Sequence, residues 1–93
     1  MRLAPGDVQI IRDELAKFDA TAEVILFGSR TDDHARGGDI DLWVRSTRIG
    51  YEDGLRLKLR IEERLGDGHV DLIVNSGEPH PLAGVVAETG IPL

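Results

Sequence analysis

The sequence predicts a small α/β (α+β) domain, with a mixed β-sheet and helices packed on one face of it. Apolar runs of strand length alternate with amphipathic segments of helical period. A helical segment separates the second and third runs, which is the connection that parallel neighbouring strands require. Only a loop separates the first two runs, and that suits an antiparallel pair.

The first half of the chain contains one predicted helix and two predicted strands. A helix over residues 7–18, with Asp7 as its N-cap, is predicted by the apolar residues that share one face: Val8, Ile11, Leu15 and Phe18. Residues 23–27 form an apolar run that stops at Gly28, which is typical of a buried strand. Residues 39–44 predict the second strand, after a polar loop.

The second half of the chain contains a segment that could be interpreted as a strand or as a helix. Residues 55–61 alternate between apolar and charged side chains, which is the period of a strand, yet their composition is that of a helix. We interpret the segment as a helix that ends at Gly66, because glycine is common at the position directly after the last turn of a helix. Residues 70–74 predict the third strand, and residues 82–88 predict a short last helix.

Composition excludes several classes of protein. The 93 residues suit a single domain over 1–93 and include no cysteine, so a disulfide scaffold and a thiolate zinc site are excluded. No apolar run approaches the ~18–20 residues that cross a bilayer, so we expect no membrane and a cytoplasmic location. The net charge of −6 argues against direct nucleic-acid binding. A chain of this charge that handles phosphates needs a cation.

Acidic side chains gather at the starts of two predicted strands. Asp39 and Asp41 flank one residue of the second strand, so they point to the same face. Asp71 holds the matching position in the third strand, and Gly28 and Ser29 directly follow the first. The predicted pairing brings these residues to one corner of the sheet.

Carboxylates at this corner would repel one another. Two unit charges at ~4 Å cost about 4 kcal/mol at an effective dielectric constant of 20. A bound cation removes this cost, and Mg²⁺ is typically held by carboxylates together with substrate phosphates. Gly28 allows backbone to approach a phosphate closely, and Arg30 and Arg36 offer donors to phosphate oxygens.

This combination of motifs resembles the nucleotidyltransferase superfamily of DNA polymerase β and kanamycin nucleotidyltransferase. Its signature is Gly-Ser, a spacer, Asp-x-Asp, and a third acid on a later strand. The chain has Gly-Ser at 28–29, nine spacer residues, Asp-Ile-Asp at 39–41, and Asp71. LFGSR, GGDIDLWV and HVDLIV are most similar to the minimal nucleotidyltransferases (MNT) found in HEPN/MNT toxin–antitoxin pairs.

The resemblance implies transfer of a nucleoside monophosphate, usually AMP from ATP, to an acceptor hydroxyl. Asp39 and Asp41 would bind the Mg²⁺ ions that bridge the triphosphate, two of them when the nucleotide is bound. Asp71 would bind the metal near the acceptor and help to deprotonate the attacking hydroxyl. The residues that would bind the nucleotide are Gly28, Ser29 and Arg30.

The resemblance also implies a partner, because the predicted domain leaves no room for an acceptor-binding domain. Minimal nucleotidyltransferases accompany a small helical HEPN-family protein, and in known pairs the antitoxin adenylylates this toxin. Two alternatives stay open: a non-catalytic antitoxin that works by binding, and the catalytic subunit of a two-component enzyme that modifies a small molecule. Homo-oligomerisation, base preference and the number of nucleotides transferred are also open.

Other residues that attract notice have structural interpretations. Trp43 lies in a predicted strand and is expected in the core. His34, His69 and His80 lack metal-ligand spacing, and we expect the last two to be structural or solvated. The apolar tail is expected to be partly core, or a subunit interface if it is exposed.

Overall fold

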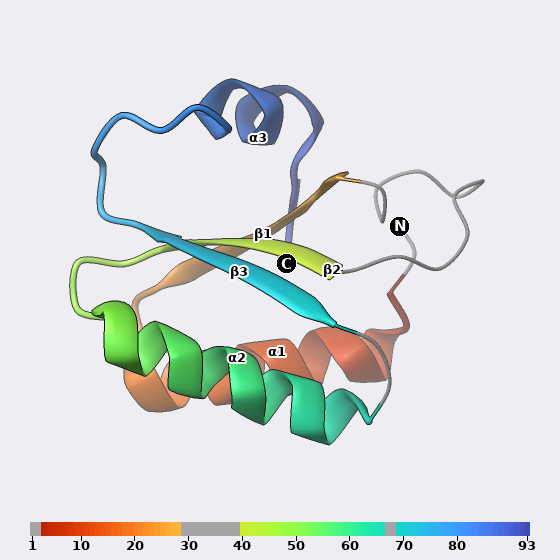
Figure 1. The fold of residues 1–93 in the computed structure, drawn as a ribbon. Helices are drawn as coiled ribbons and strands as arrows, with labels where there is room; N and C mark the ends of the chain where they lie inside the picture. The colour runs from red at the N-terminus through yellow and green to blue at the C-terminus, as the bar shows by residue number, and fades with distance from the viewer. Residues whose placement is uncertain (1–2, 29–39, 67–68) are drawn as a thin grey trace.

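A computed structural model describes residues 3–28, 40–66 and 69–93 of the chain (Figure 1). These residues form three helices and a four-stranded sheet with the order β3-β2-β1-β4. The elements in chain order are α1 (Pro5–Phe18), β1 (Glu23–Phe27), β2 (Ile40–Arg45), α2 (Tyr51–Leu65), β3 (Val70–Asn75), α3 (Ala83–Thr89) and β4 (Ile91–Pro92).

The sheet is mixed, which confirms the predicted fold class. Strand β1 pairs antiparallel with β2, and β2 pairs parallel with β3 across the α2 crossover. Both pairings agree with the prediction from the connecting segments. The sequence did not predict β4, whose two residues pair antiparallel with β1 through Leu26 and Ile91.

Helices lie on both faces of the sheet (Figure 1). The expectation of helices on one face holds for α1 and α2, which pack with Leu26 and Leu42 in the main core. Helix α3 lies on the opposite face, where its Val86 packs with Ile25 and Trp43. The physical reason is that β1 carries apolar side chains on both faces of the sheet. A helical layer on one face alone would leave the apolar side chains of the other face exposed to water.

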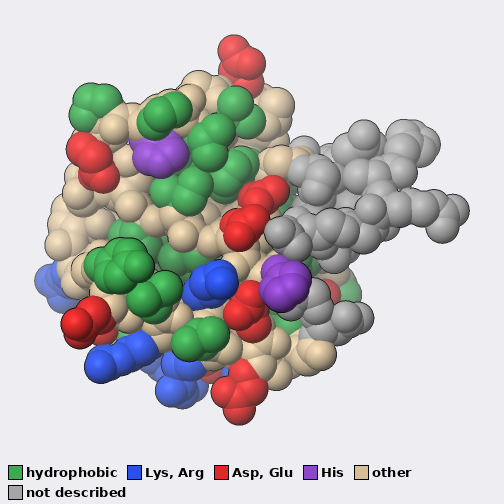
Figure 2. Space-filling model, viewed as in Figure 1, with side chains coloured by type: hydrophobic (Ala, Val, Ile, Leu, Met, Phe, Trp, Pro, Cys, Tyr) green, Lys and Arg blue, Asp and Glu red, His purple; other side chains and the backbone are tan. Residues whose placement is uncertain are grey.

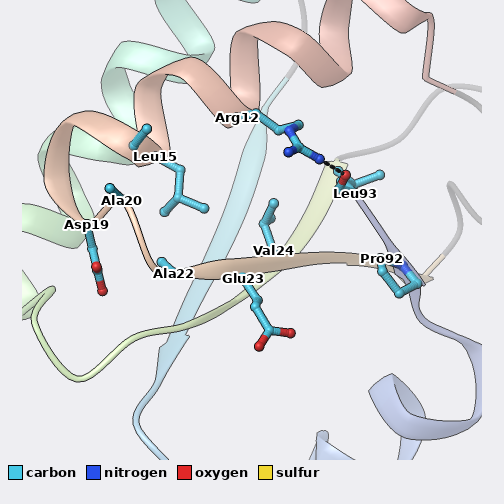
Figure 3. A pocket seen from close by; sticks show the side chains of 10 residues that line it. Arg12, Leu15, Asp19, Ala20, Ala22, Glu23, Val24, Pro92 and Leu93 are labelled. Carbon is cyan, nitrogen blue, oxygen red and sulfur yellow. Dashed lines mark hydrogen bonds between the residues drawn. The ribbon is translucent and has the colours of Figure 1, made fainter.

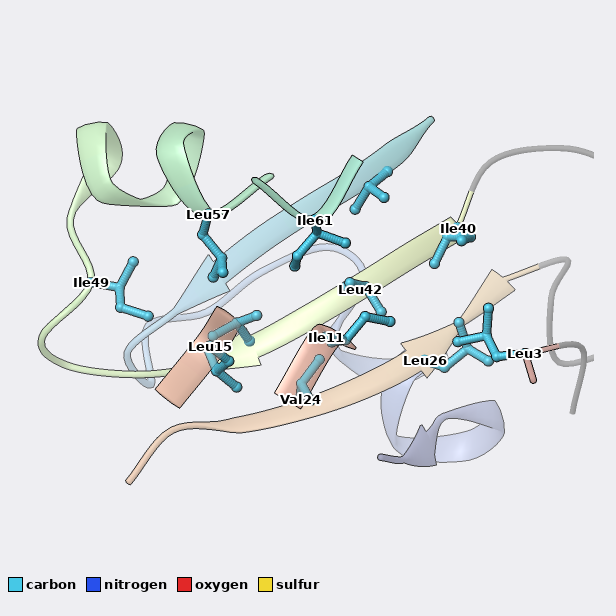
Figure 4. Close-up of a cluster of buried hydrophobic side chains, with 12 residues drawn as sticks. Leu3, Ile11, Leu15, Val24, Leu26, Ile40, Leu42, Ile49, Leu57 and Ile61 are labelled. Carbon is cyan, nitrogen blue, oxygen red and sulfur yellow. The ribbon is translucent and has the colours of Figure 1, made fainter. Parts of the chain in front are cut away.

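The main core joins α1 and α2 to the sheet. Figure 4 shows side chains from α1 and from α2 converging on the strands. Leu26, Leu42 and Leu57 are fully buried within it. Truncating a buried leucine typically costs 2–5 kcal/mol, so these contacts fix the strands that carry the predicted site.

The helix boundaries correct one prediction and confirm another. Helix α1 begins at Pro5 rather than at Asp7, with Ala4 in the N-cap position. The prediction of Asp7 as N-cap is therefore wrong: Asp7 lies in the first turn and accepts a hydrogen bond from the Ala4 backbone N–H at 3.3 Å. Proline suits the first helical position because that position needs no hydrogen-bonded N–H. The ambiguous segment is helical, and Gly66 follows α2 with φ +77°.

An almost fully buried carboxylate links the two helices. Glu14 of α1 is 1% exposed and accepts hydrogen bonds from Arg60 at 2.7 Å, Arg64 at 2.9 Å and Lys17 at 3.0 Å. The hydrogen bond from Arg60, followed by that from Lys17, lowers the pKa of Glu14 to about 2, against the opposing effect of burial. Two of its three partners belong to α2, so the cluster fixes α1 against α2. Periodicity does not reveal such a cluster.

None of the helices in the described part of the chain is long and apolar enough to cross a membrane. The longest of them, α2, carries charged residues along much of its length.

Replacing Glu14 with glutamine is expected to lower the free energy of unfolding at neutral pH by about 1–3 kcal/mol. The folded state holds the Glu14 pKa near 2, below the ordinary 4.5, so its contribution is complete above 4.5 and declines as the pH falls toward 2. The difference between wild type and Glu14→Gln should therefore shrink over that range. Urea unfolding at several pH values measures it, with Glu88→Gln, at an exposed position of α3, as control. Equal stabilities at neutral pH would contradict the interpretation.

Candidate active site

Three of the six residues predicted from the sequence to form the site lie in the described part of the chain. They are Gly28, Asp41 and Asp71. Predictions for the other three concern positions outside the described residues, namely Ser29, Arg30 and Asp39.

The parallel pairing of β2 and β3 places Asp41 directly opposite Asp71. Partners in register on adjacent strands present their side chains to the same face of a sheet. That face also carries Trp43 and α3, and it is opposite to the one that α1 and α2 cover. Asp41 is half-buried in a central strand, whereas Asp71 is exposed on β3, at one end of the described strand order. The structure thus brings these two predicted residues together.

Gly28 completes this corner of the sheet. Its φ is +79°, a left-handed conformation that favours glycine. It follows Phe27, the register partner of Asp41. A Cβ atom at position 28 would overlap Oδ2 of Asp41 and lie 3.1 Å from Cγ of the same side chain. Glycine is therefore required here both by the backbone and by the closeness of the carboxylate.

The donor chemistry of this corner fits Mg²⁺. Two carboxylates on neighbouring strands supply hard oxygen ligands, and a divalent ion would offset their mutual repulsion. Within residues 3–28, 40–66 and 69–93, no group of three or more histidine or acidic side chains is placed to hold a metal. The predicted third carboxylate, Asp39, lies outside those ranges.

An apolar wall adjoins the two aspartates on the same face. Trp43, two residues along β2 from Asp41, is buried as predicted and makes edge contacts with Phe27 and His80, at ring-centroid distances of 6.5 Å and 5.1 Å. Nδ1 of His80 accepts a hydrogen bond from the Leu82 backbone N–H at 3.0 Å, so this histidine serves to join the β3–α3 connection to the wall. A wall of this kind lowers the local dielectric constant and strengthens charge interactions at its border.

Sequence reasoning missed a second buried carboxylate, Asp19. It accepts hydrogen bonds from the hydroxyls of Ser46 and Thr21, both at 2.7 Å. These bonds, Ser46 first, hold the pKa of Asp19 below its ordinary value. Asp19 thereby links the α1–β1 turn to the β2–α2 connection. Asp19 and Ser46 are 27 positions apart in the sequence, so no local motif predicts this contact.

Asp19 also borders a pocket of about 280 Å³ between α1, β1 and β4 (Figure 3). Arg12 donates a hydrogen bond to the Leu93 carbonyl at 2.6 Å on its border. The pocket adjoins Glu23 and Val24, at the start of β1, whereas Gly28 follows the end of that strand. It is therefore separate from the corner that holds Asp41.

Fold and site together define an α/β domain that presents paired carboxylates beside a glycine turn. Residues 8–89 match the family model of the nucleotidyltransferase domain, and the chain belongs to that family. No curated protein sequence matches the chain.

The fold is also similar to that of a chain in the crystal structure of a mutant of the toxin–antitoxin MntA–HpeT. The TM-score is 0.75 at 22% sequence identity, over 92% of this chain and 70% of the other. Identity at that level shows a shared fold.

Alanine at position 28 is expected to disturb the site more than the fold. Gly28→Ala and Gly66→Ala each place a side chain at positive φ, which costs about 1–2 kcal/mol. Only Gly28→Ala forces Asp41 to move, because nothing lies within 4 Å of a Cβ at position 66. We therefore expect a loss of stability in urea unfolding for both variants, at least as large for Gly28→Ala. If ATP with Mg²⁺ raises the melting temperature of the wild type, we expect Gly28→Ala alone to lose that shift. A thermal shift in Gly28→Ala as large as that of the wild type would contradict the idea that the closeness of Gly28 to Asp41 matters for nucleotide binding.

Proposed function

We propose that the chain is a Mg²⁺-dependent nucleotidyltransferase that transfers AMP from ATP to a hydroxyl of a partner protein. Membership of the nucleotidyltransferase domain family supports the reaction class. The observation that carries the proposal is the register pair of Asp41 and Asp71, two carboxylates on one face beside a glycine that no other residue could replace without moving Asp41.

Asp39, Asp41 and Asp71 would hold the metal. When bound, Mg²⁺ offsets the charge of the triphosphate and of the carboxylates and stabilises the leaving pyrophosphate. Asp41 suits a ligand position because it lies in a central strand, with Gly28 close to its carboxylate and Asp71 as its register partner on β3. A fixed ligand favours one geometry of the nucleotide over others.

Gly28, Ser29 and Arg30 would bind the phosphates. The positive φ of Gly28 turns the chain at the end of β1, which favours the approach of a phosphate to backbone N–H groups. Ser29 adds a hydroxyl donor, and Arg30 adds a cation in a chain whose net charge is −6.

Asp71 would accept the proton of the attacking hydroxyl. In the proposed step, the acceptor oxygen bonds to the α-phosphorus, the bond from that phosphorus to pyrophosphate breaks, and the hydroxyl proton passes to a carboxylate oxygen. Asp71 is exposed on β3, whereas Asp41 is half-buried between two strands. A protein acceptor reaches an exposed side chain at the end of the strand order more easily.

The proposed acceptor is a small helical HEPN-type protein in a toxin–antitoxin pair. The similarity in fold to a chain of the MntA–HpeT toxin–antitoxin supports this context. That crystallised mutant carries two aspartate-to-glutamate replacements at positions two residues apart, the same spacing as Asp39 and Asp41 here. The cysteine-free sequence suits a reducing cytoplasm.

Replacing Asp71 with asparagine is expected to reduce transfer by roughly 100-fold or more, because loss of a metal-binding carboxylate and proton acceptor raises the barrier by several kcal/mol. The assay follows label, carried on the α-phosphate of ATP, into the proposed HEPN-type acceptor. Asp53→Asn, a change of the same kind on α2, should keep full activity.

Label carried on the γ-phosphate should remain unattached in the same assay, since pyrophosphate leaves. Undiminished transfer by Asp71→Asn, with circular dichroism showing an intact fold, would eliminate the assignment. Intact mass spectrometry of the acceptor should show the mass of added AMP, and a shift of any other kind would exclude adenylyl transfer.

A further inference from the structure

One carboxylate of α2, that of Glu62, contacts the first residue of β3. Its side chain is 18% exposed, and its Oε2 accepts a hydrogen bond from the Val70 backbone N–H at 2.9 Å. Lys58 Nζ and His69 Nδ1 each lie 3.8 Å from the same oxygen, which is beyond hydrogen-bond distance. Figure 2 shows basic, acidic and histidine side chains close together where α2 and β3 meet. The close contact of this oxygen is therefore with the backbone of β3.

The Val70 N–H points away from β2. The carbonyl of the preceding residue, His69, accepts a hydrogen bond from the Ile40 N–H of β2 at 2.9 Å. Backbone groups of successive strand residues point to opposite sides, so those of Val70 face the other side of β3. Strand β3 stands at one end of the described strand order, so no strand of the described part of the chain lies there. Glu62 thus supplies the acceptor that a further strand would otherwise supply.

This hydrogen bond acts on the residue directly before Asp71. Val70 is buried, and an unsatisfied donor at such a position costs about 1–3 kcal/mol. Val70 pairs in register with Ile40, as Asp71 does with Asp41. Apolar packing of Val70 in the main core restrains its side chain, whereas the hydrogen bond restrains the distance and direction of its backbone. Asp71 itself is exposed, so its position depends on the backbone that carries it.

We propose that Glu62 is a positioning residue for Asp71. By accepting the Val70 N–H, its carboxylate holds the first residues of β3 where Asp71 stands opposite Asp41. This inference rests on the function proposed for Asp71 in nucleotide transfer. It assigns to α2, on the other face of the sheet, a direct part in the geometry of the paired acids.

The test compares Glu62→Ala with Glu62→Gln in the assay with label on the α-phosphate. Glutamine keeps an oxygen that can accept the Val70 N–H, whereas alanine does not. Because misplacing a reacting group by about 1 Å can cost roughly 100-fold, we expect Glu62→Ala to lower kcat at least tenfold. The KM for ATP should stay within about threefold, since Gly28 and Asp41 lie on other strands. Glu62→Gln should keep kcat within about threefold of the wild type.

Two control variants separate positioning from other effects. Lys58→Met removes the cation near Glu62 and leaves the hydrogen bond to Val70, so its kcat should match that of the wild type. Glu14→Gln weakens the contact of α1 with α2 rather than that of α2 with β3. Assayed below its melting temperature, it should also keep its kcat. A loss of kcat in Glu14→Gln as large as that in Glu62→Ala would assign the effect to general stability and overturn the proposal.

Hydrogen exchange of backbone amides, followed by NMR, tests the same proposal without turnover. The Asp71 amide should exchange at least tenfold faster in Glu62→Ala than in the wild type, and Glu62→Gln should restore the slow rate. Rates are taken relative to the Val44 amide of the central strand β2, which corrects for a change in global stability. If the wild type transfers no nucleotide, the proposed function fails, and the exchange rates still decide whether Glu62 holds Asp71.

Three results would overturn the positioning role. The first is an Asp71 amide that exchanges in Glu62→Ala as slowly as in the wild type. The second is a kcat of Glu62→Ala equal to that of an active wild type. The third is a Glu62→Gln variant that loses as much kcat as Glu62→Ala while circular dichroism shows an intact fold, because the charge rather than the hydrogen bond would then matter.

Discussion

The parallel pairing of β2 with β3 is the constraint on which the candidate site depends. Side chains alternate between the faces of a sheet, so a slip of one residue would send Asp71 to the face opposite Asp41. Helix α2 supports the register: its Glu62 accepts a hydrogen bond from the Val70 backbone N–H at 2.9 Å, and its Leu57 and Ile61 pack with Leu42 and Val70 in the main core. The buried contacts of α2 thus fix the distance between two acids on the opposite face of the sheet.

Local patterns were enough to predict the strands, both pairings and the meeting of Asp41 with Asp71. Apolar runs and connection lengths carry that information, because they decide which segments can pair and in which direction. They carried no signal for β4, which has only two residues, nor for the position of α3 on the second face. The cluster around Glu14 was also missed, since it joins residues 46 and 50 positions apart that no spacing rule relates.

The most direct test of the paired-acid site is NMR with Mn²⁺ in place of Mg²⁺, in the presence of a non-hydrolysable ATP analogue. Paramagnetic broadening falls steeply with distance from the ion, so it locates the ion without any assay of turnover. The account predicts that the amide signals of Gly28, Asp41 and Asp71 broaden first as Mn²⁺ is added, while those of Asp53 and Asn75 broaden less. Broadening centred on the acids of α2, with Asp41 and Asp71 unaffected, would contradict it.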